Sequence, residues 1–208
     1  MKGHDSHNPQ ENKKEIYENV SSFLYHSISD MQSTIRSIDT KLGFILILNI
    51  IPITNIDKIY SCISQVMNTA DLCALKILTI LIMILCAIHW LLACICTYRG
   101  ITSIDNPKTH VSRAHGHAEG SYYTGGLFSL NFVDAFFNKS SITSKKTFSE
   151  YRKDIPESND QTLNELAFDK MKLVYIRDMK LNRQKWAFRL TAYWVMLGFI
   201  TYVMAKNV

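Results

Sequence analysis

The chain has 208 residues, of which 47% are hydrophobic and 20% charged, and its formal net charge is +5 at pH 7. That length accommodates one domain or two small ones. The sequence contains no phosphate-binding glycine loop, no HExxH and no GxSxG, so we expect no enzyme activity. Charged blocks alternate with long uncharged apolar runs, which predicts an all-α membrane protein with about three transmembrane helices.

The N-terminal 20 residues are polar and mixed in charge, so we expect no secretion signal there. Residues 10–40 are predicted to form an amphipathic helix, because apolar residues recur every three or four positions. No Gly or Pro interrupts this helix before the next apolar run, and we expect it to continue into that run. The predicted apolar face contains Ile16, Val20, Phe23, Leu24, Ile28, Met31, Ile35 and Ile38.

The first candidate span is residues 42–56, LGFILILNIIPITNI. Its purely apolar part is about 12 residues, whereas about 20 cross a bilayer core. Pro52 is acceptable in a span if neighbouring helices satisfy the carbonyl that it frees. Two interpretations stay open, a complete span and a half-inserted helix. Residues 57–76 are interpreted as a short outer loop.

The clearest span is residues 77–98, ILTILIMILCAIHWLLACICTY, which carry no formal charge. A buried helix of a soluble protein would show a polar face, but only His89 and two threonines interrupt this run. His89 is either a functional residue or a hydrogen-bonded packing residue. The five cysteines show no CxxC spacing, and we expect them to be reduced.

Residues 99–125 read as loop, with a turn signal at Asn106-Pro107, and residues 139–160 are polar, with another boundary at Pro156. Between these stretches, GGLFSLNFVDAFF is predicted to be a short helix near the membrane. The stretch HVSRAHGH matches no standard zinc spacing, so a polar loop is favoured over a metal site and we expect no metal. Its histidines are His110, His115 and His117.

Residues 160–186 are predicted to form a second charged helix that begins at Asp160. Its wide apolar face should pack against the helix of residues 10–40, with Phe23 and Met171 in the interface. That face combines two adjacent stripes, Leu163, Leu166, Ala167, Met171, Val174 and Leu181 beside Phe168, Tyr175, Met179 and Trp186.

The basic residues of this region have three interpretations: a solvated face that sets topology, a contact with anionic lipid, and part of a phosphate-binding site. For the third, Arg177 and Arg183 are the preferred ligand-binding residues, because a guanidinium grips phosphate in a planar fork. Lys172 and Lys108 are the further candidates.

The last span is residues 190–205, extended towards Trp186 if Arg189 reaches the interface. Residues 99–189 hold 15 of the 23 Lys and Arg, and positive residues stay on the cytoplasmic side. We therefore expect the N-terminus and residues 99–189 to be cytoplasmic. The predicted organisation is a cytoplasmic helix (1–41), two transmembrane helices with their outer loop (42–98), a basic helical sensor region (99–185) and a C-terminal transmembrane helix (186–208).

Four stretches in this order resemble the transmembrane effectors of bacterial Pycsar antiphage systems. SIDTKLGFILILN opens the first span, and TSIDNPKTH follows the second. GGLFSLNFVDAFF comes next, and DQTLNELAFDKMKLVYIRDMKLNRQKWAF is similar to the family's long helix before the last span. The resemblance covers most of residues 30–205. The chain departs from the family's pattern in a short first span and a His-rich insert.

The resemblance implies a membrane effector of antiphage defence. A partner pyrimidine cyclase would supply a cyclic pyrimidine mononucleotide, cyclic UMP or cyclic CMP, and the effector would then impair the inner membrane and cause abortive infection. We expect a homo-oligomer in the lipid bilayer that has no cofactor and binds no DNA or RNA. The alternative is a constitutive membrane scaffold or accessory subunit without nucleotide gating.

Overall fold

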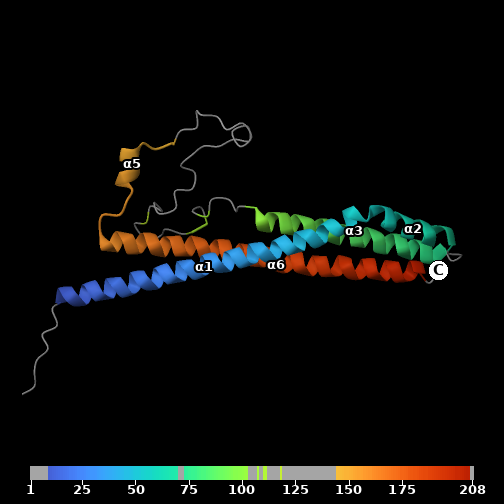
Figure 1. Ribbon diagram of the computed structural model, residues 1–208, viewed down its shortest axis with the longest axis horizontal. Helices are drawn as coiled ribbons and strands as arrows, with labels where there is room; N and C mark the ends of the chain where they lie inside the picture. The colour runs from blue at the N-terminus through green and yellow to red at the C-terminus, as the bar shows by residue number, and fades with distance from the viewer. Residues whose placement is uncertain are drawn as a thin grey trace, which may run out of the picture. The chain divides into compact units, whose positions relative to one another are not determined.

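In the computed structural model, the described residues are 9–69, 73–102 and 144–206, with Pro107, His110, Val111 and Ala118. They form helices and, within these ranges, no strand, which confirms the all-α prediction. The predicted helix GGLFSLNFVDAFF lies outside the described residues. The helices are α1 (Pro9–Thr54), α2 (Ile56–Thr69), α3 (Cys73–Ile101), α5 (Phe148–Lys153) and α6 (Asn159–Lys206) (Figure 1).

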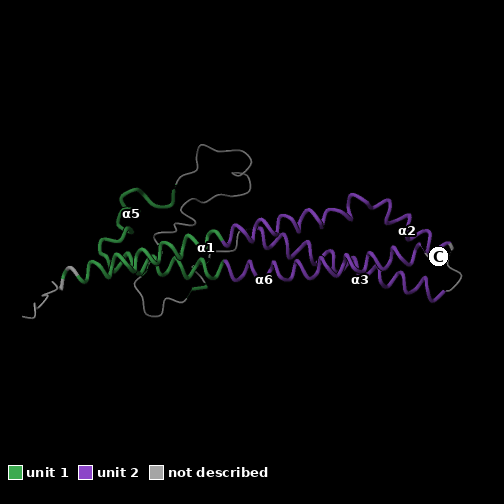
Figure 2. Tube along the Cα trace, turned by 60° about the horizontal axis from the view of Figure 1, so that its bottom comes forward, with its two compact units in different colours: residues 1–33, 105–176 green, residues 34–104, 177–208 purple. Residues whose placement is uncertain are grey.

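The chain divides into two compact units (Figure 2). Unit 1 consists of residues 1–33 and 105–176, and unit 2 of residues 34–104 and 177–208. The boundaries fall inside α1 and inside α6, and both helices continue through them without a break. The prediction that each charged helix runs on into an apolar one is therefore confirmed.

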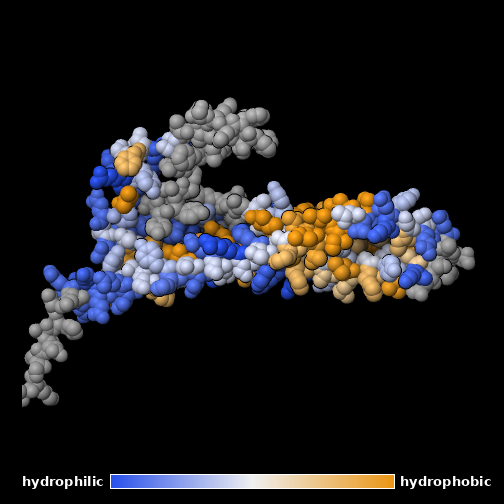
Figure 3. Space-filling view, viewed as in Figure 1, coloured by the Kyte–Doolittle hydropathy of each residue, from blue (hydrophilic) through white to orange (hydrophobic). Residues whose placement is uncertain are grey.

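Three helices, α1, α3 and α6, are long and apolar enough to cross a membrane, so this chain is a membrane protein. Hydrophobic side chains gather around α3 and the C-terminal parts of α1 and α6 (Figure 3). The apolar part of α1 ends at Thr54, where the side chains of Thr54 and Asn55 both donate to the Ile51 carbonyl, each at 3.0 Å. These two bonds add to the backbone N–H of Asn55, which donates to the same carbonyl at 3.2 Å.

The prediction of a loop over residues 57–76 is wrong for most of its length, because α2 occupies Ile56–Thr69. Apolar side chains recur at Ile59, Ile63 and Val66, which gives this helix one apolar face. Val66 is fully buried and packs with Ala205 near the end of α6. Contact with the bundle therefore stabilises a helix that would be marginal alone at 14 residues.

The inward side of α1 follows a seven-residue repeat. Leu24, Ile38 and Ile45 occupy one position of the repeat and are buried, and Ile28, Leu42 and Asn49 occupy the other. This spacing of three and four residues is that of a helix that packs along its length against other helices. The predicted face is correct from Leu24 onward. It is wrong before that residue, where side chains of the predicted face are exposed: Ile16 by 56%, Val20 by 40% and Phe23 by 64%.

Helix α3 presents small residues to the bundle. Its buried side chains are Thr79, Ala93 and Thr97, together with Gly100. Small residues allow membrane helices to approach closely, because lipid provides no hydrophobic drive for their association. A Cβ added at Gly100 would lie 2.7 Å from the Leu42 side chain, which is fully buried. A larger residue at Gly100 would therefore require the Leu42 side chain to shift where α3 approaches α1.

Helix α6 begins one residue earlier than predicted, and Ser158 rather than Asp160 caps it. The Ser158 hydroxyl accepts from the backbone of Gln161, whose side chain accepts from the backbone of Ser158 in return. This reciprocal pair satisfies free N–H groups of the first turn. The short helix α5 has the same device, in which the backbone N–H of Thr147 donates to Glu150 and lowers the pKa of that carboxyl.

The buried side of α6 in unit 1 is more polar than its sequence suggests. Leu166, Phe168 and Leu173 are buried, but so are the charged side chains of Glu165, Asp169 and Lys172. Met171 is 52% exposed, so its assignment to the interface with residues 10–40 is wrong. Phe23 is 64% exposed but does contact α6, because the Lys170 ammonium lies over its ring, 4.7 Å from the centroid. The two helices do meet in unit 1, through this cation–aromatic contact.

Candidate functional site

A polar centre lies among the three apolar helices of unit 2, at Asn49 of α1, of which 1% is exposed. The Asn49 amide Nδ2 donates to the Thr97 hydroxyl of α3 at 3.3 Å. Its Oδ1 accepts from the Trp194 indole at 3.0 Å and from the Thr191 hydroxyl at 3.3 Å, both on α6. One side chain therefore connects all three candidate membrane spans by hydrogen bonds.

Two further hydrogen bonds extend this centre. The indole of Trp90 on α3 donates to the backbone carbonyl of Asn49 at 2.8 Å. The Cys86 thiol donates to the carbonyl of Trp194 at 3.4 Å. The six side chains carry no formal charge and form no nucleophile–base pair, so this geometry favours holding or rearranging the helices over catalysis.

A charged pair connects α1 and α6 elsewhere in unit 2. The Lys180 ammonium donates to the Asp39 carboxylate, and 8% of the lysine side chain is exposed against 40% of the aspartate. Nearby apolar packing comes from Ile38 and Leu42, one residue before and three after Asp39, in a cluster with Ala187. The lysine depends on its partner more than the aspartate does, because it is the better shielded from water.

The preferred phosphate residues, Arg177 and Arg183, both lie in unit 2 and both have partners inside the chain. Arg183 donates to the carbonyl of Arg99, in the last turn of α3, where carbonyls lack helical partners. Arg177 pairs with its neighbour Asp178 at 2.8 Å, and both side chains are partly exposed. The two arginines are six residues apart on α6, so they point to different faces of the helix.

The other two predicted ligand residues are not brought into that group. Lys172 belongs to unit 1, where it is 2% exposed and pairs with Asp169 at 2.8 Å. Its ammonium also lies 5.3 Å from the centroid of the Phe168 ring. Lys108 lies outside the described residues. The four predicted residues therefore do not form one described site.

The histidines have local partners where the structure describes them. His89 lies 2.8 Å from the Leu85 carbonyl and meets the Tyr193 ring edge-on, which is the packing role considered for it. In unit 1, His110 stacks on Tyr175 with 4.7 Å between ring centroids. His115 and His117 lie outside the described residues. Within the described ranges no group of metal-ligating side chains is found, and the five cysteines are free thiols.

Sequence reasoning missed the role of Asn49, although a signal was visible. Asn49 stands alone in an apolar run, and a polar residue inside a membrane span usually faces the bundle interior. The burial of Lys180 had no comparable signal, because its neighbours on α6 include exposed charges such as Lys185.

Comparisons with protein-family models, with curated proteins and with solved structures give no match to this chain.

Proposed function

We propose that this chain is a membrane effector of bacterial antiphage defence, gated by a cyclic pyrimidine mononucleotide that a partner cyclase makes. Upon binding, the spans would rearrange and impair the inner membrane, which is the activity that the Pycsar resemblance implies. The observation that carries the proposal is the continuity of α1 and α6. Each is one helix with a charged part outside the apolar region and an apolar part within it.

A ligand changes such a protein only if it binds two arrangements with different affinity. The polar centre at Asn49 supplies an element that can have two arrangements, because its hydrogen bonds are exchangeable and lie between helices rather than within one. Individual hydrogen bonds between membrane helices contribute only about 0.6 kcal/mol on average. A ligand with modest differential affinity is therefore sufficient to exchange them.

Exposed apolar residues on α1 support the proposal of a homo-oligomer. Ile16, Val20 and Phe23 are separated by four and three residues, so they share one helix face in unit 1. An exposed stripe of this kind is typical of a helix that packs against another chain.

A constitutive scaffold is the second candidate. It is favoured by Arg183, whose guanidinium is engaged with the Arg99 carbonyl and so has a structural role without any ligand. Nucleotide binding separates the two candidates, because a scaffold has no reason to bind one.

We predict that purified full-length protein in detergent binds cyclic UMP or cyclic CMP, and that Arg177→Ala weakens this binding by roughly 10- to 150-fold. The factor follows from the loss of one charge-assisted hydrogen bond, about 1.5–3 kcal/mol, at about 1.4 kcal/mol per decade. Arg177→Lys should recover part of the affinity, because it keeps the charge and loses the fork. Isothermal titration calorimetry measures the affinity of wild type, Arg177→Ala and Arg177→Lys for the nucleotide.

Arg152→Ala is the matched control, since Arg152 is an exposed arginine of α5. This variant should bind the nucleotide as wild type does. Arg183→Ala should also lower stability, because it removes a partner from the last turn of α3, so its binding is measured well below its unfolding temperature. If wild type binds neither nucleotide, the scaffold takes the place of the gated effector. If wild type binds a nucleotide and Arg177→Ala and Arg183→Ala bind it equally well, neither Arg177 nor Arg183 belongs to the site.

The proposed orientation places the N-terminus and residues 99–189 in the cytoplasm of the bacterial cell. It rests on the excess of Lys and Arg in that segment, which short outer segments lack. We predict that a reporter fused after Val208 is active in the periplasm and that one inserted at Ser144 is active in the cytoplasm. Paired alkaline phosphatase and fluorescent protein fusions measure this. Activity of both positions on the same side would mean that α6 does not cross the membrane.

A further inference from the structure

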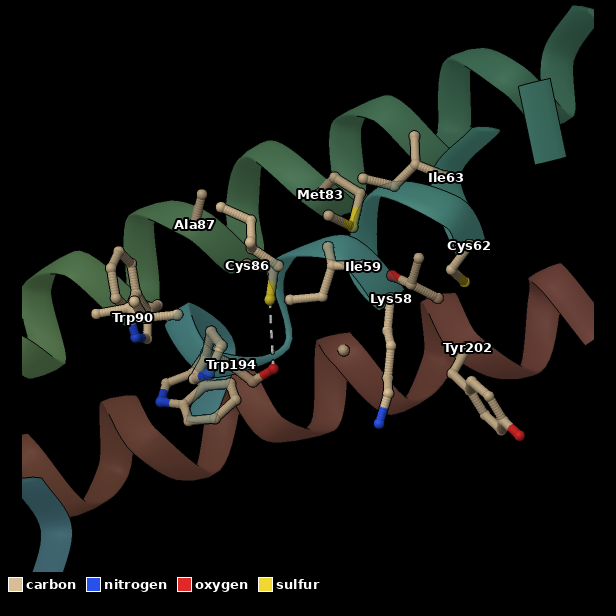
Figure 4. A pocket seen from close by; sticks show the side chains of 15 residues that line it. Lys58, Ile59, Cys62, Ile63, Met83, Cys86, Ala87, Trp90, Trp194 and Tyr202 are labelled. Atoms are coloured by element: carbon tan, nitrogen blue, oxygen red, sulfur yellow. Dashed lines mark hydrogen bonds between the residues drawn. The ribbon is translucent and has the colours of Figure 1, made fainter. Parts of the chain in front are cut away.

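A large apolar cavity lies within unit 2, between α2, α3 and the C-terminal part of α6. Its volume is about 520 Å³, within the range of small-molecule sites. Trp90 and Trp194 stand together at one end, and Tyr202 and Cys62 lie towards the other (Figure 4). The side chain of Lys58 extends from α2 along this cavity towards α6 (Figure 4).

A second cavity, of about 350 Å³, adjoins the first, because Lys58, Cys62 and Tyr202 line both. Its other lining residues are mostly polar or charged: Asp57, Ser61, Gln65, Ala205 and Lys206. An apolar chamber that opens into one edged by charged and amide side chains matches a molecule with an apolar tail and a polar head.

The charges of the second cavity favour an anionic head. Asp57 lies in the first turn of α2, where the positive end of the helix dipole stabilises its carboxylate. Lys58 and Lys206 form no ion pair with any other residue that the structure describes. The Lys206 ammonium lies 5.8 Å from the Tyr202 ring centroid, at the wall that the cavities share. The second cavity is thus lined by two lysines that no described carboxylate neutralises.

We propose that the two cavities bind one anionic phospholipid, with an acyl chain in the apolar cavity and the headgroup phosphate between Lys58 and Lys206. The bilayer supplies this ligand directly to helices that cross it. A water-soluble nucleotide fits less well, because the larger cavity would leave its polar groups without partners. This site is separate from the proposed nucleotide response and does not depend on it.

The test uses full-length protein in lipid nanodiscs and the fluorescence of Trp90 and Trp194. The chain has three tryptophans, so Trp186→Phe is the common background. Phosphatidylglycerol or phosphatidylcholine with brominated acyl chains is added at increasing mole fraction, because bromine quenches a tryptophan that it contacts. We expect half-maximal quenching at a clearly lower mole fraction of phosphatidylglycerol. Equal curves for the two lipids would overturn the proposal.

Gly198→Leu tests the apolar cavity. Gly198 lines it, and a Cβ added there meets no atom within 4 Å, so a larger side chain has room to fill the space. Gly43→Leu is the matched control, since a Cβ there also meets nothing within 4 Å and Gly43 does not line the cavity. We expect Gly198→Leu to abolish the preference for phosphatidylglycerol and Gly43→Leu to keep it. Quenching of Gly198→Leu identical to that of the background protein would place the lipid outside the cavity and reject the proposal.

Lys58→Gln and Lys206→Gln test the head site. Each removes one positive charge and places no larger side chain in the apolar cavity. Each should weaken the preference for phosphatidylglycerol by about fivefold, the effect of one basic residue near an anionic lipid surface. Quenching by phosphatidylcholine should stay unchanged in both. If the double variant keeps the full preference, these lysines do not hold the headgroup and the proposal fails, whatever the outcome for Gly198→Leu.

Discussion

Asp39→Ala should lower the free energy of unfolding by about 3–5 kcal/mol, because it leaves the Lys180 ammonium buried without its carboxylate. The lysine side chain is 8% exposed in the pair, so water cannot replace the lost partner without rearrangement. Lys180→Met should cost less, since the Asp39 side chain is 40% exposed and stays hydrated. Unfolding by sodium dodecyl sulfate in mixed micelles, followed by circular dichroism, measures the difference.

Two further variants separate the burial effect from a general effect of charge. Asp178→Ala removes the partner of Arg177, but that pair is 31% and 58% exposed and should contribute at most about 1 kcal/mol. The double variant Asp39→Ala/Lys180→Met should recover most of the loss, because an apolar replacement of a buried pair is often neutral. If Asp39→Ala and Asp178→Ala destabilise equally, the Lys180 ammonium is not buried as described.

Asn49→Leu should lower the free energy of unfolding by about 2–4 kcal/mol. It removes three hydrogen bonds that connect α1 with α3 and α6. Bonds between membrane helices contribute about 0.6 kcal/mol each on average and up to about 1.7 kcal/mol. The indole N–H of Trp194 adds to the loss, because it is left buried without an acceptor. The same detergent titration, with wild type beside the variant, measures the loss.

The matched control for this prediction is Asn68→Leu. Asn68 is exposed and bonds only within its own helix, to Ser64, so its replacement should change stability by less than about 0.5 kcal/mol. Adding Trp194→Phe to Asn49→Leu should restore part of the loss, because replacing both partners by apolar groups removes the unpaired donor. Loss of the same size in the single and double variants would show that the unpaired indole N–H of Trp194 contributes nothing to it.

The sequence by itself determined the class of this protein and the course of its long helices. A run of 22 residues without formal charge has only one stable conformation in a bilayer, because each backbone polar group must be satisfied within its own segment. The absence of Gly and Pro between residues 10 and 42 likewise determined that the charged part of α1 continues into its apolar part. These features depend only on residues that are close together in the sequence, so they can be predicted from the sequence alone.

Hydrophobic periodicity alone could not predict which apolar side chains of a helix are covered by another helix. Leu24 and Phe23 are adjacent and both apolar, yet Leu24 is buried and Phe23 is 64% exposed. The same holds for Met171, which lies between the buried Lys172 and the half-exposed Lys170. A residue becomes buried only where another helix covers it, and the position of that helix is not a property of the segment itself.

Only the tertiary structure decided which polar side chains meet. Asn49 and Thr191 are 142 residues apart in the chain, and Asp39 and Lys180 are 141 apart. No spacing rule connects such positions, because their proximity depends on how α1, α3 and α6 approach one another. That approach depends in turn on small residues such as Gly100 and Ala187, which have no chemistry of their own and act by leaving room for their neighbours.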